Sequence, residues 1–369
     1  MNKNKICWVT PDCFIDCDME IIPHIKDFDI YWIILFNKQD NRYNEKDFDS
    51  LRRKHRSLSI KFIHNKSRAR YPQTIFFYLK IRDIIKRENP DVIYFNVMPS
   101  NPYILPLYFW LPKDKTIVTA HDGRVTASMS FANIIKYGFY LAFQSVKHVN
   151  MFSQYQAHIF NTNFPGKDVT VIPLALKDFG MPTVQKRTDC IGFLYFGTIH
   201  SEKNLELLIE AANQLAEEGV LGFKISINGV WRVDWKLEDK IRHPEIFEIN
   251  IGNVPNKEIP NLFAYNHYAV YPYKNMSQSG AIKCAYNYNT PVIVSDLPGF
   301  TDEMQEGIDG YSFKSESIDD LKTVIRKCIS FSSNEYDALQ RRMAKHIEDV
   351  YGKDKIVKSY IEMFHKIIN

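Results

Sequence analysis

The sequence lacks any apolar run long enough to cross a lipid bilayer. Its longest uncharged, aromatic-rich stretch, VMPSNPYILPLYFWLP at residues 97–112, is interrupted by four prolines. It is also shorter than the ~20 residues that a transmembrane helix needs. The first residues, MNKNKICWVTPDCFIDCDME, carry charges where a secretory signal peptide has an apolar core. We therefore expect neither a membrane span nor a secretion signal, and we expect a cytoplasmic location.

Several common binding motifs are also missing. The six cysteines, at positions 7, 13, 17, 190, 284 and 328, form no CxxC pair and no grouping with histidine of the kind that holds zinc. We expect reduced thiols, most of them packed in the interior, and no metal site. The glycine fingerprints GxGxxG and GxxxxGK[ST] are absent, which argues against NAD-binding and P-loop proteins.

The length and composition indicate a globular protein with two domains. A chain of 369 residues exceeds what one hydrophobic core usually serves, and its 45% hydrophobic and 24% charged residues are typical of a soluble fold. Short β-type runs alternate with helical patterns, which predicts parallel sheets covered by helices on both faces. The expected strands are 5–10, 29–36, 91–96, 116–122, 148–153 and 169–174, then 191–196, 223–228, 246–252, 267–273 and 291–296. A polar stretch at 176–189 suits a linker, so the fold class expected is α/β with two Rossmann-like domains.

Two of the expected helices have a clear apolar face. In the helix expected over 71–89, the residues that gather on one side are Phe76, Leu79, Ile81, Ile84 and Ile85. In the helix expected over 203–219, the apolar stripe consists of Leu205, Leu208, Ile209, Ala212 and Leu215. Gly219 is a suitable stop for this second helix.

Two loops in the second half could bind an anion. In doubly wound sheets ligands lie at the carboxyl ends of the strands, where loops lead into helices. After the strand 191–196, Gly197 permits a close turn and Lys203 is expected to open the next helix and meet a phosphate, although a solvated lysine is the simpler alternative. After the strand 267–273, the residues at 277–280 read Ser277, Gln278, Ser279 and Gly280. They suit either an anion-binding helix start or a plain helix cap.

Taken in order, these segments resemble the retaining nucleotide-sugar glycosyltransferases of the GT-B fold, glycosyltransferase family 4. The resemblance rests on FGTIHSEKNLELLIEA at 196–211, IGNVPNKEIPNLFAYNHYAVYPY at 251–273 and SQSGAIKCAYNYNTPVIVSDLPGFTDEMQEGIDGYSF at 277–313, the last matching a branch whose donor loop reads SQSG. It covers most of residues 190–330 and extends more loosely over the first half. It implies two Rossmann-like domains facing across a cleft. The expected domains are 1–183, with a C-terminal helix at 353–369 packing back on it, and 184–352.

The resemblance also implies a set of donor-binding residues. These are Gly197, Thr198, Lys203, Gly229, Val254, Tyr273, Ser277, Gln278, Ser279 and Gly280. Lys203 and the N–H groups of Ser279 and Gly280 would stabilise the leaving diphosphate without a metal or other cofactor, since no DxD-like pair stands in the second-half loops.

The sequence departs from the family at three of the expected contacts. Most members have two glutamates, eight positions apart, that contact the transferred sugar and the ribose; alignment from TPVIV puts Met276 and Cys284 at these positions. An arginine usually follows the glycine of the first loop, where Thr198 stands here. The SQSG branch also lacks the glutamates, so the departures do not imply loss of activity. They place more of the diphosphate charge on Lys203 and residues 277–280.

In the first half, the resemblance places His121, at the end of the strand 116–122, near the transferred sugar and the acceptor, with Asp122 on the acceptor side. The alternative from the residues alone is a helix-capping aspartate preceded by a surface histidine. Asp16 and Asp18, in the segment after the first strand, face the acceptor or cap a helix, and we favour capping.

The charge distribution bears on the acceptor. Residues 1–180 hold 25 Lys and Arg against 17 Asp and Glu, whereas the remainder holds 22 against 26. The excess is concentrated at 51–71, LRRKHRSLSIKFIHNKSRARY, which suits an anionic membrane surface or a solvated basic face; nucleic acid is not expected. The stretch 130–149 could lie in a membrane interface or form an ordinary buried helix.

The expected function is therefore transfer of a sugar from a UDP- or GDP-sugar to a glycan or lipid-linked acceptor in cell-surface polysaccharide synthesis of the capsule or O-antigen type. The enzyme would be peripheral at the inner face of the membrane. A non-catalytic nucleotide-sugar-binding or scaffold protein of the same fold is the first alternative, and a sugar-nucleotide epimerase of GT-B shape is a weaker one.

Overall fold

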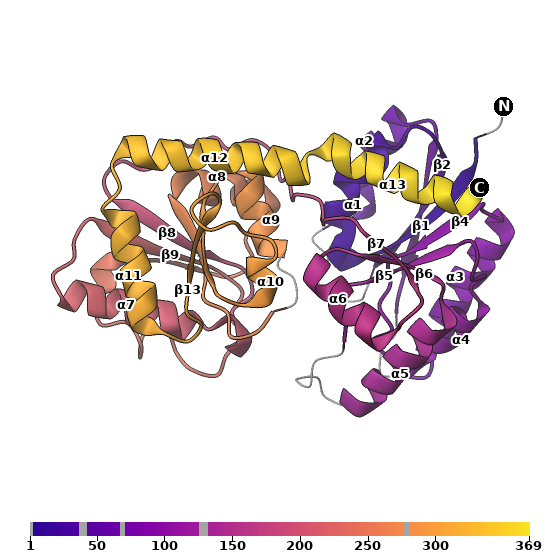
Figure 1. Ribbon diagram of the computed structural model, residues 1–369, viewed down its shortest axis with the longest axis horizontal. Coiled ribbons are helices and arrows are strands. Elements are labelled where there is room, and N and C mark those ends of the chain that lie inside the picture. The colour runs from indigo at the N-terminus through magenta and orange to yellow at the C-terminus, as the bar shows by residue number, and fades with distance from the viewer. Residues whose placement is uncertain (1–2, 37–42, 67–70, 125–131, 277–279) are drawn as a thin grey trace. The chain divides into compact units, whose positions relative to one another are not determined.

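The chain folds into two compact α/β units. The computed structural model describes residues 3–36, 43–66, 71–124, 132–276 and 280–369. Unit 1 comprises Met1–Ala175 and Tyr351–Asn369, and unit 2 comprises Leu176–Val350 (Figure 1). The units divide after Ala175, whereas the boundary was expected after residue 183. Both positions lie in the segment between the strands β7 (Asp168–Val171) and β8 (Ile191–Phe196), which has no helix or strand. The expected fold class, α/β with parallel sheets covered by helices, is confirmed.

Unit 1 is built on a seven-stranded parallel sheet in the order β3-β2-β1-β4-β5-β6-β7. Its strands are β1 (Lys5–Pro11), β2 (Asp29–Phe36), β3 (Leu58–His64), β4 (Val92–Phe95), β5 (Thr116–Ala120), β6 (His148–Met151) and β7 (Asp168–Val171). Its helices are α1 (Ile15–Ile21), α2 (Asp49–Lys54), α3 (Thr74–Glu88), α4 (Leu105–Trp110), α5 (Ala132–Ser145), α6 (Gln154–Asn163) and α13 (Lys353–Ile368). Short 3₁₀ turns lie at Asp12–Phe14, Ile22–His24, Glu45–Phe48 and Pro102–Ile104.

Helices bury apolar residues on both faces of this sheet. Helices α3 to α6 form one core with the strands, and α1 and α13 contribute to the other. The C-terminal helix α13 packs through Tyr360 and Phe364 on the ring of Trp8 in β1. The last residues of the chain therefore complete the core of the first unit, as Figure 1 shows by the yellow helix against the indigo strands.

Unit 2 is built on a six-stranded parallel sheet in the order β10-β9-β8-β11-β12-β13. Its strands are β8 (Ile191–Phe196), β9 (Phe223–Gly229), β10 (Phe247–Ile251), β11 (Tyr268–Tyr271), β12 (Val292–Ser295) and β13 (Gly310–Phe313). Its helices are α7 (Leu205–Glu217), α8 (Ile259–Tyr265), α9 (Gly280–Asn287), α10 (Pro298–Thr301), α11 (Ile318–Ile329) and α12 (Ser333–Tyr351). Short 3₁₀ turns lie at Ser201–Lys203, Pro244–Ile246 and Asn256–Glu258.

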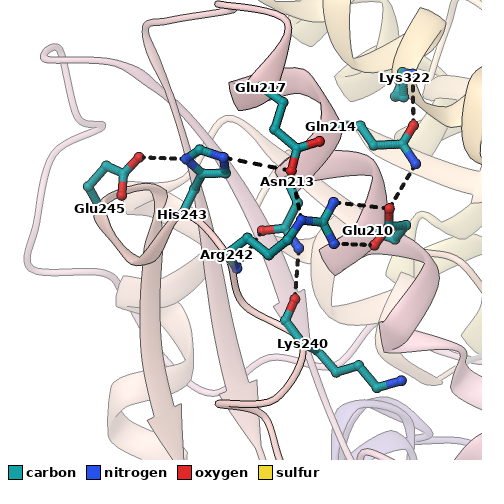
Figure 2. Close-up of polar contacts among 9 residues, drawn as sticks. All are labelled: Glu210, Asn213, Gln214, Glu217, Lys240, Arg242, His243, Glu245 and Lys322. Atoms are coloured by element: carbon teal, nitrogen blue, oxygen red, sulfur yellow. Dashed lines mark hydrogen bonds and ion pairs between the residues drawn. The ribbon is translucent and has the colours of Figure 1, made fainter.

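The long connection between β9 and β10 is held on α7 by a polar network. Arg242 forms paired hydrogen bonds with the carboxylate of Glu210 at 2.8 and 3.1 Å and an ion pair with Glu217 (Figure 2). The buried Asn213 side chain accepts from the Arg242 backbone N–H and donates to the Lys240 carbonyl oxygen. This network anchors residues 240–242 without contributing a predicted site residue.

In each parallel sheet, successive strands are added first toward one edge and then, from one point on, toward the other edge. Ligands of doubly wound folds bind at this switch point. In unit 1 the sheet grows from β1 to β3 on one side and from β4 to β7 on the other. In unit 2 the equivalent reversal separates β8 from β11. The loops after β1 and β4, and those after β8 and β11, are therefore the places for a site.

Three details of the structure differ from the expectations. The strands β3 and β13 were not expected, and both lie at sheet edges, where β3 alternates buried with exposed residues and β13 is only four residues long. Phe76 was expected on the inner face of its helix but is 70% exposed, because α3 turns Tyr78, Ile81 and Ile85 toward the core.

By contrast, all five residues expected on the inner face of α7 are buried. Gly219 has a φ of 78° just after α7 ends, as a helix-terminating glycine does.

Within the described ranges, no helix is both long and apolar enough to span a bilayer. Four of the six cysteines, Cys7, Cys17, Cys284 and Cys328, are buried, whereas Cys13 is exposed.

Candidate functional site

In unit 2, two glycines bring the ends of β8 and β9 into backbone contact. Gly197 and Gly229 have φ values of 137° and 152°, a region that side-chain-bearing residues rarely adopt. A Cβ atom at Gly229 would lie only 1.7 Å from the carbonyl oxygen of Gly197. The structure thus provides a packing reason for glycine at 229, whereas the expected donor contact of Gly229 stays a prediction. Thr198, the next expected contact, is exposed in the loop.

Lys203 and Tyr273, both expected in the donor site, lie in contact. The Nζ atom of Lys203 is 3.5 Å from the centroid of the Tyr273 ring, a cation–π arrangement. The backbone N–H of Lys274 donates to the Glu202 carbonyl oxygen at 2.9 Å, which holds the loop after β8 to the segment after β11. Burial lowers the pKa of the Lys203 ammonium to about 8.

The local structure around Lys203 differs from the expectation. Lys203 ends a short 3₁₀ turn, Asn204 has a left-handed φ of 49°, and α7 begins only at Leu205. Lys203 therefore does not open the helix, because the turn and the left-handed residue separate them. Its ammonium is oriented by the aromatic ring of Tyr273 instead.

Helix α9 begins at Gly280, the last of the residues expected to bind phosphate. Ser277, Gln278 and Ser279 lie outside the described residues. A Cβ atom at Gly280 would lie 2.9 Å from both Cε and Nζ of Lys177, so the absence of a side chain makes room for this lysine. Lys177 was not identified from the sequence, where it lies in the expected linker about a hundred residues before α9. The hydroxyl of Tyr271 donates to the Ala281 carbonyl oxygen at 2.9 Å and ties β11 to the same helix start.

A buried ion pair fixes the middle of α9. Lys283 and Glu303 are both buried, and Nζ of Lys283 is 3.1 Å from an oxygen of Glu303. Burial raises the pKa of Glu303, and the neighbouring ammonium opposes this shift. Losing one partner would leave a buried charge without compensation, so the pair constrains how α9 sits against the turn after β12.

Val254, a further expected donor contact, is buried in the loop after β10. Because β10 is the edge strand beyond β9, this loop is two strands away from the loop of Lys203.

In unit 1, His121 lies at the carboxyl end of β5 in an enclosed position. It is buried, and its Nε2 atom donates to the side-chain oxygen of Asn96, at the end of β4, at 2.8 Å. The rings of Phe14 and Phe152 lie against the imidazole, with centroids 4.1 and 5.2 Å away. Burial lowers the pKa of His121 to about 3, so the imidazole is neutral at physiological pH. Within the described part of the chain, Nδ1 has no hydrogen-bond partner.

Neither Asp16 nor Asp18 is the N-cap residue of α1, and the capping hypothesis is wrong for Asp18. Phe14 occupies the N-cap position and offers no side-chain bond, while Asp16 and Asp18 lie inside the first turn. The carboxylate of Asp18 instead accepts from Trp8 Nε1 at 3.0 Å and Thr10 Oγ1 at 2.6 Å. Burial raises the pKa of Asp18 to about 7.

The contacts of Asp16 and Asp122 do not test their expected roles on the acceptor side. Asp16 is buried and accepts from the backbone N–H of Cys17. Asp122 follows β5 in a half-buried position and caps no described helix, because α5 begins only at Ala132. Their expected acceptor contacts stay predictions.

No cluster of three or more His, Cys, Asp or Glu side chains that could hold a metal ion occurs in the part of the chain that the structure describes.

The fold of the whole chain matches solved glycosyltransferase structures. A glycosyltransferase from Rickettsia africae superimposes with a TM-score of 0.74 and 15% identity over 100% of both chains. Sucrose-phosphate synthase from Thermosynechococcus elongatus gives a TM-score of 0.76 at 10% identity over 99% of each chain. Anabaena HepE, crystallised with UDP and glucose, gives 0.69 at 13% identity over 98% of this chain and 100% of that one.

The sequence provides an independent comparison. No curated protein matches the chain. Residues 167–348 match the family model described as Glycosyl transferases group 1. The chain therefore has the GT-B fold. Over residues 167–348 it is also similar in sequence to the glycosyl transferases group 1.

In this GT-B chain, the positions where the resemblance implies glutamates have no acidic replacement nearby on α9. Cys284 is buried, and Met276 is half-buried just before residues outside the description. A thiol and a thioether are weak hydrogen-bonding groups, so neither can replace a carboxylate toward a sugar or ribose hydroxyl. Two cationic side chains lie at these loops of unit 2: the expected Lys203 over Tyr273, and Lys177 beside Gly280, which the structure adds.

Proposed function

We propose that the chain transfers a sugar from a nucleoside diphosphate sugar to a glycan or lipid-linked acceptor, with retention of anomeric configuration, in cell-surface polysaccharide synthesis. The observation that carries the proposal is the position of Lys203, held above Tyr273 in a unit whose sequence matches the glycosyl transferases group 1 family. Its loop and the one leading to α9 follow the strands at which the sheet reverses direction, β8 and β11.

The proposed reaction breaks the bond between the anomeric carbon and the diphosphate oxygen. The electron pair leaves with the diphosphate, an acceptor oxygen bonds to the anomeric carbon, and the acceptor proton passes to the leaving diphosphate. A cation held near the departing oxygen lowers this barrier, and it is more effective where it is partly shielded from water. Lys203 meets this requirement. Lys177, which lies beside Gly280 at the start of α9, supplies a second cation. It compensates for the family arginine, whose position is occupied here by Thr198.

The role proposed for His121 follows from its neutral state. With Nε2 bonded to Asn96, Nδ1 carries no proton and can only accept a hydrogen bond. We assign it to a hydroxyl of the sugar or the acceptor. A pKa of about 3 makes proton donation by this imidazole ineffective at neutral pH.

The experiment is a panel of UDP-, GDP- and ADP-sugars with extracted glycan and lipid-linked glycan acceptors, read as nucleotide release and product mass. UDP-glucose is the first donor to test, because HepE was crystallised with it. Lys203→Ala is expected to lower turnover by about 10²–10³-fold, the usual cost of one transition-state donor. Lys345→Ala, which removes an exposed lysine from α12, is the matched control and should leave turnover unchanged. Because lysines supply the charge, EDTA should have no effect.

Turnover that is absent with every donor, or unaffected by Lys203→Ala, would contradict the proposal. Donor binding without turnover would favour the alternative, a nucleotide-sugar-binding or scaffold protein. The observation in favour of that alternative is the occupation of both expected glutamate positions by sulfur-containing side chains, at Met276 and Cys284.

A peripheral membrane location belongs to the same proposal. Of the basic stretch 51–71, the structure describes all but 67–70, and Arg52, Arg53, Lys54 and Lys61 are exposed on α2 and β3. Such a surface attracts anionic headgroups by charge alone, and this attraction weakens as salt is added.

A further inference from the structure

Helix α5 of unit 1 has an apolar stripe on its solvent-facing side. Ile134, Tyr137 and Tyr140 are 57%, 66% and 48% exposed, although Phe139 and Phe143 of the same helix are buried in the core. A helix that only covers a sheet needs one apolar face, with polar residues on the other. The second apolar face indicates contact with something other than water.

A groove of about 350 Å³ lies beside this stripe. Its walls come from α5 through Tyr137, Phe139 and Tyr140 and from the end of α6 through Phe164. The ring centroids of Tyr140 and Phe164 are 5.5 Å apart, so the walls are largely aromatic. Its volume lies at the low end of the ~300–1,000 Å³ that is usual for ligand pockets.

The charges at the groove have one sign. Arg124 and Lys136 contribute to its lining, and none of the lining residues is acidic. In the described part of the chain neither cation forms an ion pair, and both are exposed. An apolar channel with two uncompensated cations suits a ligand that joins a hydrocarbon chain to an anionic group such as phosphate.

The groove begins next to the residue assigned to the acceptor side. Gly123 lines it and follows His121 by two positions. Gly123 is held on α6 because its N–H donates to the Gln156 side chain at 2.8 Å and its carbonyl oxygen accepts from Asn163 at 3.1 Å. A Cβ atom at Gly123 would lie 2.5 Å from the Gln156 carbonyl oxygen. The backbone after β5 therefore packs directly on α6, beside the groove.

We propose that this groove binds an acceptor whose phosphate group is carried on a hydrocarbon chain, with the phosphate at Arg124 and Lys136 and the chain along Tyr137 and Tyr140. This proposal rests on the proposed function for the reaction, and it narrows the acceptor to the lipid-linked class. It places the contact with the hydrocarbon chain on α5, which lies within the stretch 130–149 that could contact a membrane interface.

The test uses the full chain with farnesyl phosphate, a small isoprenoid phosphate, and compares it with farnesol and with inorganic phosphate by calorimetry. Farnesyl phosphate should bind at least about tenfold more tightly than either part alone, since both halves of the ligand contribute. Equal binding of farnesyl phosphate and inorganic phosphate, or no binding of farnesyl phosphate, would overturn the proposal.

Variants locate the binding. Tyr137→Ser with Tyr140→Ser should weaken farnesyl phosphate binding by about tenfold, because two aromatic contacts are lost. Lys136→Gln should weaken it by a smaller factor and reduce its salt dependence. Leu221→Ser, at an 82% exposed position in unit 2, is the matched control for removal of surface apolar area and should have no effect. All variants are at exposed positions, and circular dichroism checks that they fold. Equal loss in the control, or no loss in the α5 variants, would count against the groove.

Two further measurements separate the outcomes. Binding of UDP should be unchanged in the α5 variants, so failure of the donor assignment and failure of the groove assignment are seen independently. In sedimentation without lipid, the wild type should not self-associate through the stripe. Self-association that the tyrosine variants abolish would mean that the stripe is an interface between copies, and the proposal would be wrong. Binding to phosphatidylcholine vesicles containing phosphatidylglycerol, together with no binding of farnesyl phosphate, would mean that the stripe docks on a bilayer instead.

Discussion

The ring of Phe14 lies against the imidazole of His121, with ring centroids 4.1 Å apart. Phe14 belongs to the segment after β1 and His121 to the end of β5, so the contact joins two loops at the carboxyl edge of the unit 1 sheet. Together with Phe152 and the hydrogen bond to Asn96, it keeps the imidazole dry, neutral and oriented.

Replacing Phe14 with alanine should therefore raise the pKa of His121. The present value of about 3 arises from burial, and water admitted where the ring was would stabilise the charged form and move the pKa toward the ordinary 6.5. The measurement is an NMR titration of the imidazole, with Phe76→Ala, at an exposed aromatic residue of the same unit, as control. An unchanged His121 titration in Phe14→Ala would show that Phe14 does not shield the imidazole.

Asp18 should make the stability of unit 1 fall as the pH rises. Its pKa of about 7 in the folded state lies above the 3.8 of the unfolded chain, so the native state holds the extra proton between these values. Stability is therefore highest below pH 4 for this group and is lost as the pH rises toward 7. Asp18→Asn keeps an oxygen that can accept from Trp8 and Thr10 but cannot ionise.

The check is the free energy of urea unfolding at pH 5 and pH 8 for the wild type and Asp18→Asn. The wild type should lose more stability over this range than the variant, by a few kcal/mol at most, given ~1.4 kcal/mol per pKa unit. Glu362→Gln, at an exposed position on α13, is the control. The same pH dependence in the wild type and Asp18→Asn would contradict the prediction.

Gly229 should tolerate no side chain. Gly229→Ala combines an unfavourable φ with a Cβ atom 1.7 Å from the Gly197 carbonyl oxygen. Gly252→Ala is a matched control, because Gly252 has a φ of 150° and no atom within 4 Å of an added Cβ. The control should cost ~1–3 kcal/mol from backbone strain alone. Gly229→Ala should cost at least ~2 kcal/mol more, measured by chemical unfolding. Equal costs would mean that the backbone contact relaxes easily.

Lys177 and Gly280 should act together on the donor. An added Cβ at Gly280 meets only the flexible end of Lys177, so Gly280→Ala should fold normally and displace the ammonium. Both Gly280→Ala and Lys177→Ala are expected to weaken UDP binding by about three- to tenfold. The double variant should bind UDP no more weakly than Lys177→Ala alone, because Gly280→Ala acts only by displacing the Lys177 ammonium. Additive effects would show that the two residues act independently.

Much of the fold could be predicted from local patterns. Buried parallel strands are nearly continuous apolar runs, so β1, β2 and β8 were expected within one residue of their observed bounds. The edge strands β3 and β13 could not be recognised in this way, because one side of β3 is polar and β13 is short. Phe76 was misplaced because the apolar pattern of α3 is broad enough to fit more than one orientation of the helix.

For the candidate sites, the sequence indicated which loops to inspect and missed several residues in them. Lys203 and Tyr273 were identified separately, and the structure shows them in contact. Lys177 had no local signal, since a lysine in a polar linker is ordinary. Asp18 was interpreted as a helix cap because an aspartate near a helix start is typical of a cap. Its actual partners, Trp8 and Thr10, lie on the preceding strand, and a bond between a helix and a strand leaves no local pattern.

The sequence by itself determined that the chain forms two α/β units and where most of their strands and helices lie, because these depend on apolar periodicity within ten to twenty residues. Only the tertiary structure decided that Lys177 lies at the start of α9, that Phe14 covers His121, and that α5 has a second apolar face. These contacts depend on strand order and on helix orientation over the sheet. Both are settled by packing between segments far apart in the sequence, and no local pattern records them.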